Sequence, residues 1–199
     1  MAANTYLGAD ERRILESAKI GIAGAGGLGS NCAAHLVRAG IRKLVVADFD
    51  VVSESNLNRQ FYFRDQIGMK KTAALETNLR RIEDGLEIEA IDMRLDEGNI
   101  ARVFADCSIV VEAFDVADRK QMLYKALLPA GKTVVSAAGL AGWGRSGAMK
   151  LRKVGRGLYL AGDCESEAGA ELAPESPRVG IAAAIEANTV VALLLGLEP

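Results

Sequence analysis

Gly24-Ala25-Gly26-Gly27-Leu28-Gly29 is the stretch of this chain that decides its fold. A short apolar run, residues 20–23, stands directly before it, and residues 31–39 after it have the spacing of a helix. Glycines let a backbone approach a phosphate chain closely, and the N-terminus of the next helix directs N–H groups and a partial positive charge at the anion. The stretch therefore predicts a nucleotide-binding strand–turn–helix unit. The glycines expected at the nucleotide are Gly24, Gly26, Gly27 and Gly29.

An acidic residue, Asp48, follows at the end of the next apolar run, residues 43–47. In strand–turn–helix–strand units of this kind, a carboxylate at the tip of the second strand binds the ribose hydroxyls. The alternative is that the glycines only allow close packing of helix on strand, and that Asp48 is a solvated residue at a strand end. For Asp50 we expect a cap on the following turn.

The composition is that of an ordinary globular chain. Its 199 residues fit one domain, residues 1–199, with 50% hydrophobic and 25% charged residues. The net charge is −2, and neither a Lys/Arg cluster nor a basic tail suggests a nucleic-acid or membrane partner. The three cysteines are far apart and form no C-x-x-C pair, so we expect no structural zinc, no disulfide framework and a cytoplasmic setting.

Apolar runs alternate with helical patterns along most of the chain. This alternation predicts a Rossmann-like α/β fold, in which a mainly parallel sheet carries helices on both faces. The expected strands are residues 20–23, 44–47, 87–91, 108–113 and 133–137. The expected helices are residues 30–39, 70–83, 98–104 and 118–128.

The C-terminal part breaks this alternation. Residues 148–154 and 158–161 predict an antiparallel strand pair as a C-terminal extension of the sheet, and a crossing loop then runs to Arg178. Residues 179–197 are apolar enough to suggest a transmembrane helix, but Glu186 would be costly in a bilayer, so we predict a buried helix. A second long connection, residues 50–69, is polar and typical of a functional loop.

Four blocks of sequence, in order and at matching spacing, resemble the ThiF/MoeB/ubiquitin-activating enzyme family. They are Gly24-Ala-Gly-Gly-Leu-Gly29, Val46-Ala-Asp-Phe-Asp-Val-Val52, Ser55-Asn-Leu-Asn-Arg-Gln60 and Gly68-Met-Lys-Lys71. The resemblance resumes at Val110-Val-Glu-Ala-Phe-Asp115 and covers almost the whole chain. The short length is similar to that of the compact ThiF form associated with thiamine biosynthesis.

This resemblance implies an adenylyltransferase that uses ATP and magnesium. Such proteins adenylate the C-terminal glycine of a small ubiquitin-like sulfur carrier, here a ThiS-like protein with a Gly-Gly C-terminus, and are homodimers. A carboxylate is already ionised at neutral pH, so its attack on the α-phosphate needs no general base. The site should instead supply cations and backbone dipoles that stabilise charge on the phosphoryl group and the leaving pyrophosphate.

Three residues carry this chemistry by resemblance, namely Arg59, Lys71 and Asp115. Arg59 binds the β- and γ-phosphates through its planar guanidinium, and Asn56 helps to hold the nucleotide. Lys71 places a point charge at the α-phosphate, with Lys70 as its local rival. Asp115 follows a strand and holds magnesium. The alternatives are a polar surface loop for Asn56 and Arg59, a solvated helix end for Lys71 and a helix N-cap for Asp115.

Several further residues have weaker claims to function. Asp118 competes for the helix N-cap. In relatives an arginine before the glycine stretch reaches the partner subunit's site, but for Arg12 and Arg13 we expect exposed helix positions. Cys164 lies in the region where some relatives link covalently to the carrier, yet its acidic neighbours disfavour catalysis. For Trp143 we favour local packing over a wall of the carrier-tail channel.

Two other functions remain as alternatives. The glycine pattern is common in NAD-dependent oxidoreductases, which are the second hypothesis. However, the one histidine, His35, falls on the helix after the glycines and is badly placed for hydride transfer. A non-enzymatic scaffold that binds nucleotide and carrier is the third hypothesis. The joint presence of Asp48, Arg59, Lys71 and Asp115 argues against such a scaffold.

Overall fold

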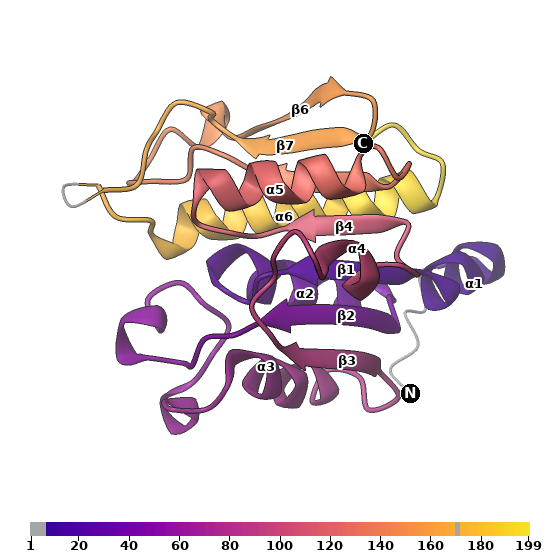
Figure 1. Ribbon diagram of the computed structural model, residues 1–199, viewed down its shortest axis with the longest axis horizontal. Coiled ribbons are helices and arrows are strands. Elements are labelled where there is room, and N and C mark those ends of the chain that lie inside the picture. Colours follow the sequence, from indigo (N-terminus) through magenta and orange to yellow (C-terminus); the bar gives the residue numbers. More distant parts are fainter. Residues whose placement is uncertain (1–6, 170–171) are drawn as a thin grey trace.

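The computed structural model describes residues 7–169 and 172–199. Within these residues, a single sheet of seven strands runs in the order β3-β2-β1-β4-β5-β7-β6 (Figure 1). The strands are β1 (Lys19–Ala23), β2 (Lys43–Asp48), β3 (Glu87–Asp92), β4 (Ile109–Glu112), β5 (Thr133–Ala137), β6 (Lys150–Gly155) and β7 (Leu158–Gly162). All neighbouring strands are parallel except β6 and β7, which form the predicted antiparallel pair.

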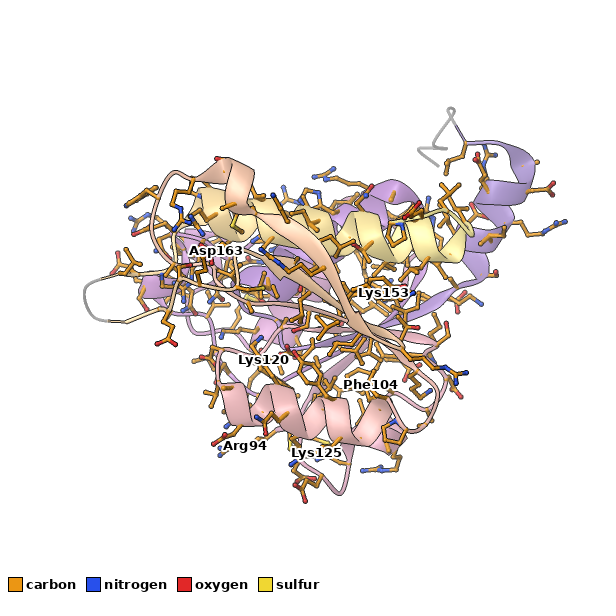
Figure 2. All side chains as sticks on the ribbon, turned by 90° about the horizontal axis from the view of Figure 1, so that it is seen from above. Arg94, Phe104, Lys120, Lys125, Lys153 and Asp163 are labelled. Atoms are coloured by element: carbon orange, nitrogen blue, oxygen red, sulfur yellow. The ribbon has the colours of Figure 1, made fainter. Side chains whose placement is uncertain are left out.

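Helices cover both faces of the sheet, as predicted for a Rossmann-like fold. They are α1 (Ala9–Ser17), α2 (Gly27–Ala39), α3 (Lys71–Arg80), α4 (Ile100–Val103), α5 (Ala117–Leu127) and α6 (Ser176–Leu194). Buried side chains of α1, α2, α3 and α6 share one core with one face of the sheet, whereas those of α4 and α5 share a second core with the other face. Figure 2 shows α6 and α5 on opposite sides of the sheet, with Phe104 beside α5. The central strands β1, β2 and β4 are nearly continuous apolar runs because both of their faces are buried.

The order of the strands reverses beside β1. The strands β2 and β3 continue on one side of β1, whereas β4 and β5 lie on its other side. In open parallel sheets, ligands bind outside the carboxyl ends of the strands that flank such a reversal. The glycine turn follows β1 and Asp115 follows β4, so the sheet brings both to the same edge.

Two of the predicted helices were too long. The helix expected over residues 70–83 is the shorter α3, and the helix expected over residues 98–104 is the single turn α4. Glu83 lies beyond the end of α3, where its buried carboxylate pairs with Arg42 at 2.9 Å. This ion pair holds the chain at the start of the turn that leads to β3, and the helical spacing of the sequence did not reveal it.

The helix α6 is long and apolar enough to cross a membrane if length and composition alone are considered. In the fold it packs against α2, β5 and β7, and half of its most apolar window is buried. It is therefore the buried C-terminal helix that the sequence predicts. Glu186 lies at its centre and is fully buried.

Candidate functional site

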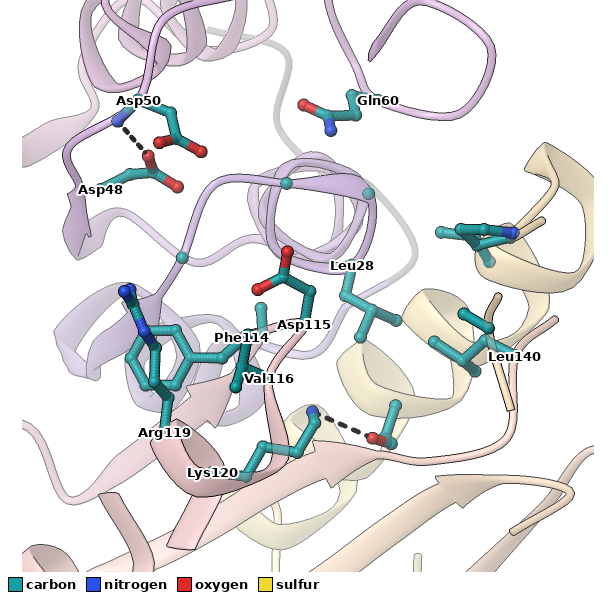
Figure 3. Close-up of a pocket in the computed structure, with 18 of the residues that line it drawn as sticks. Leu28, Asp48, Asp50, Gln60, Phe114, Asp115, Val116, Arg119, Lys120 and Leu140 are labelled. Carbon is teal, nitrogen blue, oxygen red and sulfur yellow. Dashed lines mark hydrogen bonds between the residues drawn. The ribbon is translucent and has the colours of Figure 1, made fainter. Parts of the chain in front are cut away.

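A cavity of about 570 Å³ opens at the carboxyl edge of β1, β2 and β4 (Figure 3). Its walls are the glycine turn, the end of β2, the connection that leads to α3, the residues after β4 and the first turn of α6. Most of the predicted site residues line this one cavity. They are Gly24, Gly26, Gly27, Asp48, Asn56, Arg59, Lys71 and Asp115.

The glycines of the turn fall into two groups. Gly24 has a φ of 104°, and a Cβ there would lie 2.9 Å from the carbonyl oxygen of Ala113. A Cβ at Gly29 would overlap the carbonyl oxygen of Gly24, so Gly29 is a packing position and lies outside the cavity lining. By contrast, a Cβ at Gly26 would meet only the side-chain nitrogen of Gln60, at 3.9 Å. Gly26 therefore leaves room for a ligand to approach the backbone.

The carboxylate of Asp48, at the end of β2, contacts both the glycine turn and the start of the connection that leads to α3. Its Oδ2 accepts a hydrogen bond from the backbone N–H of Ala25 at 2.7 Å, and its Oδ1 accepts one from the N–H of Asp50 at 2.8 Å. Each carboxylate oxygen has a second lone pair, so the group can still accept bonds from ribose hydroxyls. Asp48 thus caps the turn that directly follows β2. The side chain of Asp50 instead pairs with Lys71, so the expected capping role of Asp50 was wrong.

Lys71 is the better placed of the two candidate lysines. Its side chain is only 8% exposed, and its ammonium lies 2.8 Å from the Asp50 carboxylate inside the cavity. Lys70 instead pairs with Asp92 at 3.1 Å and donates to the carbonyl of Phe49. A solvated helix end, the alternative reading of Lys71, is therefore wrong.

The connection between β2 and α3 is folded around short helical turns. Asn56 ends the first of these, η1 (Glu54–Asn56), and its Oδ1 accepts a bond from the N–H of Ser53 at 3.1 Å. The Arg59 guanidinium donates to Oδ1 of Asn58 at 2.8 Å and keeps further N–H groups for a ligand. Asn31 on α2 donates to the carbonyl of Arg59 at 2.8 Å, which fixes this loop against the helix that follows the glycine turn.

A buried tyrosine ties the same connection to the glycine turn. The hydroxyl of Tyr62 donates to the carbonyl of Ala25 at 2.7 Å, and the N–H of Phe61 donates to Oγ of Ser30 at 3.0 Å. Burial raises the pKa of Tyr62 far above its ordinary value, and the charges of Asp48 and Asp50 add to the rise. The hydroxyl therefore remains a neutral donor. Neither contact follows from the local sequence, because the partners meet only in the folded chain.

Asp115 is exposed at the cavity wall, and no hydrogen bond of its carboxylate occurs among the described residues. The residue at the N-cap of α5 is Val116, without a side-chain cap. The capping roles considered for Asp115 and Asp118 were therefore wrong. A single free carboxylate at the cavity wall could hold magnesium, which proteins bind through one or two carboxylates together with substrate phosphates.

Sequence reasoning missed a further cation, Lys120, at the base of the cavity. The ammonium of Lys120, which Figure 3 shows at the cavity, donates to Oε2 of Glu112 at 2.8 Å and to the carbonyl of Ala137 at 3.2 Å. Glu112 is fully buried and also accepts bonds from Ser136 and the N–H of Phe114. The charge of Lys120 is thus balanced by a carboxylate from β4. Lys120 follows Asp115 closely in the sequence, in the first part of α5, and this proximity was its sequence signal.

A buried ion pair anchors the far wall. Asp163, directly after β7, pairs with Arg178 in the first turn of α6. Arg178 also donates to the carbonyl of Gly144 at 3.1 Å. Burial opposes ionisation of Asp163, but hydrogen bonds from Ser166, Glu165 and Arg178 outweigh burial and hold its pKa well below the usual range. The crossing segment between β7 and α6 is therefore fastened at both ends, although residues 170–171 within it lie outside the described residues.

Other predicted residues lie outside the cavity lining. Cys164 is exposed, and its Sγ lies 3.4 Å from the Arg152 guanidinium. Trp143 is 66% exposed, so the expected local packing was wrong. Arg13 is exposed and pairs with Asp10 at 2.9 Å. The helix α1 that carries Arg12 and Arg13 precedes β1 and so lies at the opposite edge of the sheet (Figure 1).

Comparison with known protein families gives a match to the ThiF family over residues 2–198. The chain belongs to the ThiF family. It is 33% identical to the adenylyltransferase and sulfurtransferase UBA4 of Candida glabrata, over 71% of this chain and 33% of UBA4. It is 35% identical to the sulfur carrier protein ThiS adenylyltransferase of Bacillus subtilis, over 63% of this chain and 38% of that protein. The chain thus spans between a third and two fifths of these two ThiF relatives.

Solved structures agree with this ThiF-family fold. The Escherichia coli tRNA N6-threonylcarbamoyladenosine dehydratase TcdA, solved with ATP, superposes with a TM-score of 0.88. The match covers 95% of this chain and 90% of TcdA, at 18% sequence identity. At that identity the likeness establishes the shared fold alone.

Proposed function

We propose that this chain uses ATP to adenylate the C-terminal carboxylate of a ubiquitin-like sulfur carrier of the ThiS type, ending in Gly-Gly. One observation carries the proposal: a glycine turn, two cations and a free carboxylate converge on one cavity at the switch point of the sheet. The names of the ThiF relatives, a ThiS adenylyltransferase and UBA4, support adenylation as the reaction.

The adenylation reaction requires stabilisation of negative charge and no general base. A carboxylate oxygen of the carrier attacks the α-phosphorus, the bond from that phosphorus to the bridging oxygen breaks, and pyrophosphate leaves with the electron pair. The carboxylate is ionised at neutral pH, so no proton has to be removed. Negative charge accumulates on the phosphoryl oxygens and on pyrophosphate, and preorganised donors lower the barrier by stabilising that charge.

The chain supplies these donors from three elements. The backbone around Gly26 and Gly27, at the start of α2, offers N–H groups to the phosphates. Lys71 carries its ammonium into the same cavity from the start of α3. Arg59 lies with its aliphatic stem against Gly27, where a Cβ would meet its Cγ at 3.4 Å, so its guanidinium can reach the end of a triphosphate. Magnesium, when bound with the nucleotide, would neutralise phosphate charge, and Asp115 would hold it.

Carrier-dependent exchange of labelled pyrophosphate into ATP tests this function. The unaltered protein should catalyse exchange only with a carrier whose C-terminal glycine is free. Arg59→Ala and Lys71→Ala should each lower the rate about 100-fold or more. Arg81→Ala is the matched control, because Arg81 is exposed after α3 and lies outside the cavity lining. Full exchange by Arg59→Ala would show that this arginine does not hold the nucleotide.

The same assay separates the competing functions. Carriers of the thiamine and molybdopterin types should be compared, and transfer RNA should be included because TcdA acts on tRNA. Binding of NADH without any response to ATP would favour an oxidoreductase, whereas carrier binding without exchange would favour a scaffold. A homodimer is part of the proposal, and analytical ultracentrifugation should give twice the mass of one chain, 21.1 kDa.

A further inference from the structure

An exposed aromatic ring stands beside the predicted ribose-binding carboxylate. Phe49 directly follows Asp48, lines the cavity and is 40% exposed. The guanidinium carbons of Arg94 and Arg119 lie 5.3 Å and 5.5 Å from the centroid of its ring. Both distances are within the range of cation–π contacts. Of the two arginines, Arg119 also lines the cavity, on the wall that carries Asp115 (Figure 3).

The two guanidinium groups are held by the ring and not by carboxylates. Among residues 7–169 and 172–199, neither Arg94 nor Arg119 forms an ion pair or a side-chain hydrogen bond, whereas nearby Lys70 is paired with Asp92 at 3.1 Å. Contact with an aromatic ring leaves the N–H groups of a guanidinium free, and its planar face can exchange one flat partner for another. Arg119 is therefore a cation at the cavity wall that pairs with no acid among the residues that the structure describes.

The position of this cluster relative to Asp48 suggests which part of a ligand it meets. In the sheet, β2 lies between β3 and β1, and the N–H of Met93, just after β3, donates to the carbonyl of Asp48 at 3.1 Å. On the other side, Asp48 accepts from Ala25 of the glycine turn. Met93 and Leu95 line the cavity on the side away from the glycine turn, and both are apolar. With the ribose at Asp48 and the phosphates at the turn, the base of a nucleotide falls on this apolar side.

We propose that Phe49 and Arg119 form the platform on which the purine base stacks, with Arg119 determining the preference for a nucleotide over a base-free triphosphate. The inference rests on the proposed function only in taking a nucleoside triphosphate as the ligand. The base covers the exposed ring and lies against the guanidinium plane, while Met93, Leu95 and Phe114 exclude water from its edges. Stacking on Phe and Arg does not require a particular exocyclic group, so ATP and GTP gain similarly from the platform.

Calorimetric titration with ATP, GTP and inorganic tripolyphosphate, at one fixed magnesium concentration, tests the platform. Arg119→Ala and Phe49→Leu should each weaken binding of ATP and of GTP about tenfold, and leave tripolyphosphate binding unchanged. Arg119→Lys keeps the charge but loses the plane, so it should resemble Arg119→Ala. Arg102→Ala removes the same charge from an exposed site on α4 outside the cavity and should bind all three ligands normally. Circular dichroism melting of each variant verifies that it is folded.

Results that differ from these expectations would contradict either the platform or the proposed function. Equal weakening of ATP and tripolyphosphate by Arg119→Ala, or normal ATP binding by Arg119→Lys, would make Arg119 a phosphate cation and overturn the platform. Normal ATP binding by all Phe49 and Arg119 variants would overturn it as well. If the unaltered protein bound neither ATP nor GTP, the proposed function itself would fail, and the platform with it.

Discussion

At the scale of single residues, the Lys71–Asp50 pair places two opposite charges in contact at the cavity before a nucleotide arrives. The ammonium of Lys71 is nearly buried, whereas the carboxylate of Asp50 is 46% exposed and lines the same cavity. An ammonium group has three donors, so Lys71 can hold Asp50 and a phosphate oxygen together. The Asp50 carboxylate then repels the phosphate while it positions the lysine.

Asp50→Asn should therefore strengthen ATP binding and weaken the fold. Removal of a negative charge close to the triphosphate should lower the Kd for ATP about fivefold, since charges about 4 Å apart near a protein surface interact strongly. The midpoint of thermal unfolding should fall, because Lys71 loses its partner while it stays buried. Titration calorimetry and melting curves measure both effects. Asp65→Asn, at an exposed position outside the cavity, is the control. Unchanged or weaker ATP binding by Asp50→Asn would contradict this account.

Glu186 is a residue whose effect should appear in the pH dependence of stability. Both carboxylate oxygens are buried without a hydrogen-bond partner among the described residues. Burial raises the pKa of Glu186 well above its ordinary value, Lys120 opposes the rise and Glu112 adds to it. The folded protein therefore keeps a proton on this group that the unfolded chain releases near pH 4.3.

Replacement by glutamine should remove this dependence. Above about pH 4.3 the free energy of unfolding of the unaltered protein falls by up to about 1.4 kcal/mol for each pH unit through this one group. In Glu186→Gln this group no longer titrates. The free energy of unfolding of the variant, relative to that of the unaltered protein, should therefore increase from pH 5 to pH 8. Urea unfolding at both pH values measures the difference. A difference that is the same at pH 5 and at pH 8 would show that Glu186 titrates normally.

At the scale of elements, the Asp163–Arg178 ion pair joins the end of β7 to the start of α6 and so holds the crossing segment over the cavity. The folded pKa of Asp163 is depressed, so the stabilisation is present above the unfolded pKa of about 3.9 and is lost as the pH falls below it. Asp163→Asn should destabilise the fold by about 3–5 kcal/mol at pH 7, because it leaves the Arg178 charge buried and unpaired.

The same variant should lose less stability than the unaltered protein on acidification from pH 5 to pH 3. Urea unfolding across this range measures the comparison. Glu165→Gln, which breaks the exposed pair between Arg145 and Glu165, is the matched control and should leave the midpoint unchanged. Equal acid sensitivity of the unaltered protein and Asp163→Asn would show that another carboxylate dominates.

At the scale of the whole molecule, the sequence predicts those elements and site residues that local sequence patterns determine. The glycine turn, Asp48 and the strand–helix alternation all lie within local patterns, and the structure places them as expected. Three contacts of the cavity could not be predicted, because their partners come from different elements and meet only through tertiary packing. They are Lys120 with Glu112, Arg119 with Phe49 and Tyr62 with Ala25. Helix ends differed for the same reason, since Glu83 leaves the helical pattern to pair with Arg42.

The contact between α6 and the glycine turn has a consequence for synthesis of the chain. A Cβ at Gly27 would lie 3.0 Å from Val179, which is in the first turn of α6 and lines the cavity. A nascent polypeptide that has emerged through β7 already carries the turn, Asp48 and Lys71, yet lacks this wall. We expect such an incomplete chain to bind nucleotide poorly until residues 176–194 have joined the fold, so that the pocket matures only when α6 packs against the glycine turn.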